Sequence, residues 1–69
     1  MSDAIRITFN GDLVEIMKNT KLIDFLHIEN ISGRFLAVIN DEVIPKSAHD
    51  STVLKEGDKL DIMSPISGG

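Results

Sequence analysis

The chain has 69 residues, a length that allows one domain with one small hydrophobic core. It contains no cysteine, which excludes disulfides, thiolate metal sites and catalysis by a thiol of its own. Hydrophobic residues make up 42% of the sequence and charged residues 26%, proportions typical of a globular chain, and a formal charge of −4 disfavours nucleic acid and favours a partner with a basic face.

The N-terminal segment, residues 1–6, lacks the basic region and apolar run of a secretory signal. No apolar stretch approaches the roughly 18 residues that a membrane span needs. We therefore expect a cytoplasmic protein that makes no contact with a membrane.

The first predicted element is a β-hairpin. Apolar residues alternate with polar ones over residues 5–9, the period of a half-buried strand. Asn10-Gly11 follows, a pair that favours a type I′ turn because both central residues of that turn need positive φ. Residues 12–17 form the predicted return strand, with Val14 and Ile16 expected to face the core.

A helix is predicted after the polar residues 18–21. Asn19 or Thr20 is expected to cap its N-terminus, because a short polar side chain can accept a hydrogen bond from the first free N–H groups. Asn30 or Gly33 is expected to end it, since either tolerates the left-handed conformation found just past helix ends. Apolar residues recur at helical spacing between these limits and predict one face packed on a sheet: Leu22, Ile23, Phe25, Leu26 and Ile28.

A second, shorter hairpin is predicted in the middle of the chain. The continuous apolar run over residues 35–39 predicts a central strand that is covered on much of both faces. Asn40-Asp41 predicts a tight turn and residues 42–44 a short edge strand. Pro45 is expected to end that strand because proline cannot donate to a strand ladder.

The remaining folded part is predicted to be an irregular crossover and a last strand. Residues 46–52 are polar, with room for one helical turn, and Val53 or Leu54 is expected to close the open end of the core. A turn over residues 56–58 precedes a last strand over residues 59–63. Two of its side chains should face inward, Leu60 and Ile62.

The C-terminal segment predicts a tail. Pro65 marks where strand pairing should stop. The five residues from there to the end, fully extended at roughly 3.3–3.6 Å each, carry the terminal carboxylate about 17 Å beyond the folded body, far enough to enter another protein's active site. We predict a folded domain over residues 1–64 and a flexible tail over residues 65–69, composed of Pro65, Ile66, Ser67, Gly68 and Gly69.

The order of elements is hairpin, helix, short hairpin, crossover and final strand. A hairpin followed by a helix across one sheet face, with the last strand free to pair in parallel beside the first, is the β-grasp arrangement of ubiquitin-like proteins. The predicted fold class is therefore α+β, with a mixed sheet, one main helix and a free Gly-Gly tail.

Four short motifs occur in order along nearly the full length of the chain. They are Phe9-Asn10-Gly11, residues 37–46, Leu54-Lys55-Glu56-Gly57-Asp58 and Ile66-Ser67-Gly68-Gly69. Together they resemble the ThiS family, the small sulfur carriers of bacterial thiazole and thiamine biosynthesis. Members often carry an aromatic residue shortly after the Pro-basic pair, where this chain has Ala48-His49.

This resemblance implies that Gly69 is the site of chemistry. A ThiF-type enzyme would use ATP and magnesium to form the Gly69 acyl-adenylate, and a sulfur donor would convert it to a thiocarboxylate. A ThiG-type thiazole synthase would then accept the sulfur. The chain itself would bind no cofactor or metal and would be a protein cosubstrate, not an enzyme.

Three alternatives remain open. MoaD-like sulfur carriers for molybdopterin also end in Gly-Gly and often have a proline in the tail, as here at Pro65. A ubiquitin-like modifier would join Gly69 to lysines through isopeptide bonds. A plain β-grasp binding module would make no use of the glycines.

Met63 is the predicted partner-binding residue of the folded body. If Leu60 and Ile62 face the core, Met63 faces the other side of the sheet at the root of the tail, where a flexible thioether suits an adaptable interface. Asp58 and Asp61 lie nearby and can meet basic side chains of a partner, although such charges more often form only a solvated face.

Other candidate chemistry is sparse. His27 and His49 are too far apart in the sequence to suggest a zinc site and are expected to be ordinary surface residues. The sequence contains no recognisable nucleophile-base pair and no phosphate-binding loop. It predicts no enzymatic activity.

Overall fold

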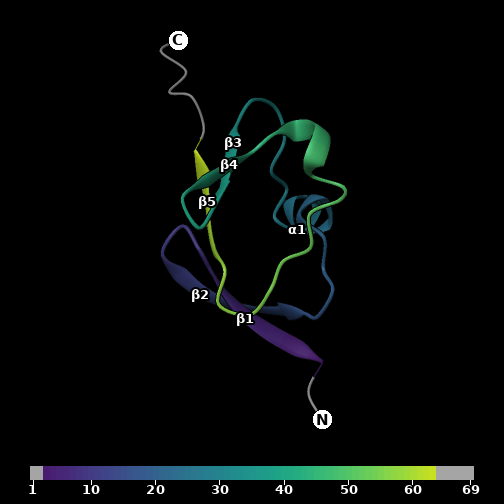
Figure 1. The fold of residues 1–69 in the computed structure, drawn as a ribbon, viewed down its shortest axis with the longest axis vertical. Coiled ribbons are helices and arrows are strands. Elements are labelled where there is room, and N and C mark those ends of the chain that lie inside the picture. The colour runs from purple at the N-terminus through teal and green to yellow at the C-terminus, as the bar shows by residue number, and fades with distance from the viewer. Residues whose placement is uncertain (1–2, 64–69) are drawn as a thin grey trace.

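The computed structural model describes residues 3–63, which form a five-stranded sheet crossed on one face by a helix (Figure 1). Its strand order is β2-β1-β5-β3-β4, with β1 and β5 parallel and the other pairs antiparallel. This topology confirms the β-grasp prediction and the parallel pairing of the first and last strands. The elements are β1 (Ala4–Phe9), β2 (Asp12–Met17), α1 (Leu22–Ile28), β3 (Leu36–Ile39), β4 (Glu42–Ile44), the 3₁₀ helix η1 (Lys46–Ala48) and β5 (Lys59–Met63).

The two predicted hairpins are present, and each turns at residues with positive φ. Asn10 and Gly11 have φ of 50° and 89°, as the predicted turn requires. Asn40 and Asp41 have φ of 51° and 70°. Asparagine and aspartate adopt this region more readily than other residues with a Cβ, so the local sequence determines where the chain reverses.

Helix α1 begins in a way that the sequence pattern did not predict. Its N-cap is Lys21, which makes no side-chain capping hydrogen bond, so the prediction of Asn19 or Thr20 is wrong. Backbone carbonyls of the crossover accept the hydrogen bonds of the first N–H groups instead. The bonds run from Leu22 to Thr52 at 2.8 Å and from Ile23 to His49 at 3.1 Å. The cap is therefore a tertiary contact.

The end of α1 follows the prediction. Asn30 has φ of 59°, its N–H donates to the carbonyl of His27, and the N–H of Ile31 donates to the carbonyl of Leu26. This pair of bonds is the Schellman arrangement, which satisfies the last helical carbonyls. Ile28 departs from the prediction, since it is 70% exposed beside the edge of the sheet, where no further strand covers it.

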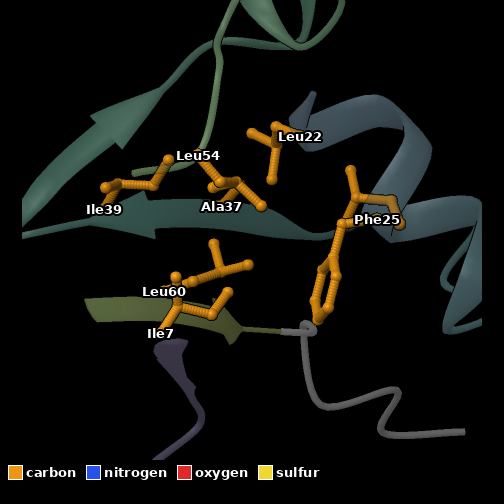
Figure 2. Packing of buried hydrophobic residues seen from close by; sticks show 8 residues of the cluster. Ile7, Leu22, Phe25, Ala37, Ile39, Leu54 and Leu60 are labelled. Atoms are coloured by element: carbon orange, nitrogen blue, oxygen red, sulfur yellow. The ribbon is translucent and has the colours of Figure 1, made fainter. Parts of the chain in front are cut away.

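The core lies between the sheet and α1, and Figure 2 shows its side chains converging from strands, helix and crossover. Phe25 reaches from the helix to Phe9 of β1 in an edge-to-face contact, with ring centroids 5.1 Å apart. Leu54 closes the open end of the core, whereas Val53 is exposed. The prediction names these two residues as alternatives. The buried cluster consists of Ile7, Leu22, Phe25, Leu26, Ala37, Ile39, Leu54 and Leu60.

The central strand of the sheet is β5, whereas the sequence pattern favoured the apolar run at residues 35–39. That run forms β3 from Leu36 onward, one strand away from the sheet edge, and Phe35 lies outside it. The run of apolar residues is continuous because β3 carries apolar side chains on both faces of the sheet. Ala37 and Ile39 enter the core, and the alternate side chains lie on the opposite face.

His49 is buried, so its prediction as a surface histidine is wrong. Its ring stacks on Phe35 with centroids 5.7 Å apart, and its Nε2 lies 3.3 Å from the carbonyl oxygen of Ile44. The imidazole therefore provides a flat ring shortly after the Pro45-Lys46 pair, where ThiS-like sequences often carry an aromatic residue. It also places a ring nitrogen next to a backbone carbonyl. His27 is exposed, as predicted.

Leu60→Ala tests the central position of β5. The Leu60 side chain is fully buried, so its truncation should lower the free energy of unfolding by about 2–5 kcal/mol in urea denaturation. Met63→Ala is the control on the same strand, because Met63 is exposed and its loss should cost less than about 0.5 kcal/mol. Equal losses in the two variants would contradict the assigned inner face of β5.

Candidate functional site

The predicted tail residues lie outside the described part of the chain, as does the predicted boundary between residues 64 and 65. These residues are Pro65, Ile66, Ser67, Gly68 and Gly69. The last described element before them is β5, which ends at Met63.

Asparagine side chains from both hairpin turns hold β5 in place. Asn10 Oδ1 accepts a hydrogen bond from the N–H of Ile62 at 2.8 Å, one residue before Met63. Asn40 Oδ1 accepts one from the N–H of Lys59 at 3.0 Å, and the backbone N–H of Asn40 donates to the carbonyl of Lys59 at 2.9 Å. Strand β5 is therefore fixed near both of its ends.

Asp58 has a structural use at the start of the same strand. One carboxylate oxygen accepts a hydrogen bond from Asn40 Nδ2 at 3.1 Å, and the other accepts one from the backbone N–H of Lys55 at 2.8 Å. These bonds fix the turn before β5. Asp61 lies on the outer face, with one carboxylate oxygen 4.0 Å from the Nζ of Lys59, a separation at which an exposed ion pair contributes little.

Met63 lies on the outer face of the sheet, away from the core, as the alternation along β5 predicted. The strand register places Leu36 opposite Met63 and Val43 opposite Val38. Met63, Leu36 and Val43 are 54%, 52% and 54% exposed, and Val38, which is only 9% exposed, lies among them. We call these residues, Leu36, Val38, Val43 and Met63, the outer patch.

The outer patch joins three strands at the point where the chain leaves the sheet. Isolated apolar residues on a surface are common, but here they are gathered on neighbouring strands. The sequence singled out Met63 alone. Leu36 and Val43 belong to other strands, β3 and β4. Only the register of strand pairing shows that they lie on the same face as Met63.

The described residues offer docking features and no catalytic ones. Across residues 3–63, no group of three or more potential metal ligands is close enough to hold an ion. Within the same range, no helix is long and apolar enough to cross a membrane. What residues 36–63 do present is an apolar surface on the outer face of the sheet at the end of β5.

The comparisons with known proteins agree with this geometry. Residues 7–69 match the family model described as ThiS family. A crystal structure of the thiamine biosynthesis protein ThiS from Geobacter metallireducens has the same fold, with a TM-score of 0.81 and 22% sequence identity over 94% of this chain and all of that one. No protein in the curated set matches the chain.

Asn10→Gly tests whether the asparagine side chain holds the end of β5. Glycine keeps the positive φ but removes the acceptor for the Ile62 N–H, so the free energy of unfolding should fall by about 1 kcal/mol in urea denaturation. Hydrogen exchange of the Ile62 amide should also become faster.

Asn30→Gly is the matched control, because Asn30 has a similar φ and ends a helix, a position that glycine suits. It should leave both measurements nearly unchanged. If the two variants behaved alike, the Asn10 side chain would have no special part in holding β5.

Proposed function

This chain belongs to the ThiS family of sulfur carriers in thiamine biosynthesis, and from that membership we propose that it carries sulfur as a thiocarboxylate on Gly69. The observation that carries the proposal is the extent of the family match, which runs through the last residue of the chain. Like the family, the chain is a carrier and not an enzyme.

The chemistry requires an activated chain end. A carboxylate is a poor electrophile at neutral pH, so one of its oxygens must first become part of a leaving group. The proposed cycle takes place in the cytoplasm. A ThiF-type enzyme binds ATP and magnesium, joins Gly69 to AMP and releases pyrophosphate. A sulfur donor then displaces AMP, and the resulting thiocarboxylate gives its sulfur to a ThiG-type thiazole synthase.

In the proposed cycle two parts of the chain have different functions. Residues 65–69 form a narrow arm that enters a partner's active site, with Pro65 at its base and the Gly68-Gly69 pair, which has no side chains, at its end. Residues 1–64 form the body that a partner recognises. All thiol chemistry belongs to the partners, because this chain has no cysteine.

We further propose that the outer patch docks on the ThiF-type enzyme. It lies where β5 ends, so a partner that binds it is close to the start of the arm. Met63 can adapt its side chain to the shape of an apolar partner surface. Asp61, opposite Val38 on the same face, offers a carboxylate to a basic side chain at the rim.

Deletion of Gly69 tests the carrier function. The variant should lose ATP–pyrophosphate exchange with a ThiF-type enzyme, while its thermal unfolding should match that of the full chain. Ser67→Ala is the control, since it keeps both terminal glycines and should retain exchange. Exchange that persisted after the deletion would contradict Gly69 as the attachment site.

The intact mass of the protein isolated from its native cell separates the remaining alternatives. Replacement of one oxygen by sulfur adds about 16 Da, and thiocarboxylate-selective alkylation distinguishes this from methionine sulfoxide. Conjugates with lysines of larger proteins would instead favour a ubiquitin-like modifier. A thiocarboxylate that supported molybdopterin synthesis and not thiazole formation would favour a MoaD-like carrier.

Val43→Glu tests the docking surface. A carboxylate in the middle of an apolar contact would remain unpaired on binding, so the Kd for the ThiF-type enzyme should rise at least about tenfold. Leu13→Glu is the control, because Leu13 is also an exposed apolar residue of the sheet but belongs to β2, outside the outer patch. Equal weakening by both substitutions, measured by calorimetry, would contradict the outer patch as the docking site.

A further inference from the structure

The two edges of the sheet differ in how well they are protected. The β4 edge has only three residues and ends at Pro45, and both features discourage pairing with another strand. The β2 edge runs over six residues, Asp12–Met17, and contains neither proline nor lysine. Among the described strands it pairs with β1 alone, and none of them lies on its other side. This edge is therefore the one suited to accept a further strand.

A groove runs between the open β2 edge and helix α1. Its apolar lining comes from both elements, with Val14, Ile16 and Met17 on the strand and Phe25 and Ile28 on the helix. Ile28 and Met17 are largely exposed although each is a large apolar residue. The groove thus places apolar surface directly beside unpaired strand backbone.

The charged residues at this groove are both acidic: Glu29 lies just after the helix, and Glu15 lies on the strand with its side chain on the face opposite to Val14 and Ile16. Lys18 and Lys21 follow β2 in the chain but do not line the groove. The groove at the β4 side has the opposite character, because its charged lining residues are Arg34 and Lys46. The two sides of the molecule therefore select partners of opposite charge.

We propose that the β2–α1 groove binds an extended segment of a partner protein in which apolar and basic residues alternate. The segment adds to the β2 edge as a further strand, so main-chain hydrogen bonds supply much of the binding. Alternate side chains enter the groove against Phe25 and Ile28. The basic side chains lie on the other face of the added strand, where they meet Glu15.

A second copy of this chain is a poor occupant for the same groove. In a symmetric pair formed through β2, the groove of each copy would bring its own Glu15 and Glu29 to the interface, and the chain has a formal charge of −4. Like charges brought together in an interface oppose association. A basic partner avoids this cost.

The groove lies away from the end of β5. The Asn10-Gly11 turn, which contacts Ile62, is at one end of the β1–β2 hairpin, and the groove residues 14–17 lie toward the other end. In Figure 1 the N-terminal end of β1, which pairs with the β2 residues of the groove, lies at the far end of the molecule from the end of β5. A partner in the groove therefore leaves the outer patch accessible, and this inference does not depend on the proposed sulfur chemistry.

A peptide titration tests the proposal. The probe is a synthetic octapeptide of alternating lysine and valine, added to the ¹⁵N-labelled full chain, and the matched control peptide has glutamate in place of lysine. The lysine peptide should cause saturable shifts in the amides of residues 13–17 and 25–29, and the glutamate peptide should not. Shifts centred on residues 36–46, equal binding of both peptides, or no saturable binding would overturn the proposal.

Glu15→Lys should weaken binding of the lysine peptide at least about tenfold, since it reverses the charge that the basic side chains meet. Glu42→Lys makes the same charge change on exposed β4 and should leave the affinity within about twofold. Equal loss in both variants would show that only net charge matters and would overturn the proposal. A concentration-dependent dimer through β2, seen by sedimentation without peptide, would do so as well.

Discussion

The insertion of β5 between β1 and β3 is the constraint on which the rest of this structure depends. The first strand and the last lie side by side in parallel, so the sheet is complete only when the two ends of the folded chain have met. Leu60 brings β5 into the core, where it is fully buried. Long-range pairing of this kind makes folding cooperative, because neither half of the sheet buries its apolar face without the other.

Two asparagines link this constraint to the hairpin turns. Asn10 and Asn40 both adopt a left-handed conformation that allows a tight turn, and both use their side-chain oxygens to bind backbone N–H groups of β5. The same residue type thus serves local turn geometry and a contact with a distant strand. Glycine would satisfy the first requirement and not the second.

The two faces of β5 have different surroundings. Leu60 and Ile62 pack inward, and Met63 faces outward with Leu36 and Val43. A change in the outer patch therefore alters the surface offered to a partner without opening the core. The acidic groove at the β2 edge lies apart from both of these faces.

The sequence by itself determined the elements, the β-grasp class and the Gly68-Gly69 ending. Periodicity shows which residues share a face of one element, and Asn-Gly or Asn-Asp pairs show where the chain reverses. The resemblance to the ThiS family also rests on sequence motifs alone. It implies Gly69 as the attachment site without any knowledge of strand pairing.

Only the tertiary structure decided which distant groups meet. It showed crossover carbonyls capping α1, His49 buried against Phe35, and β5 in place of β3 at the centre of the sheet. It also joined Leu36 and Val43 to Met63. The bond between Asn10 and Ile62 spans 52 residues. A local pattern carries no information about such a pairing, because the pairing depends on strand register and on the packing of the whole core.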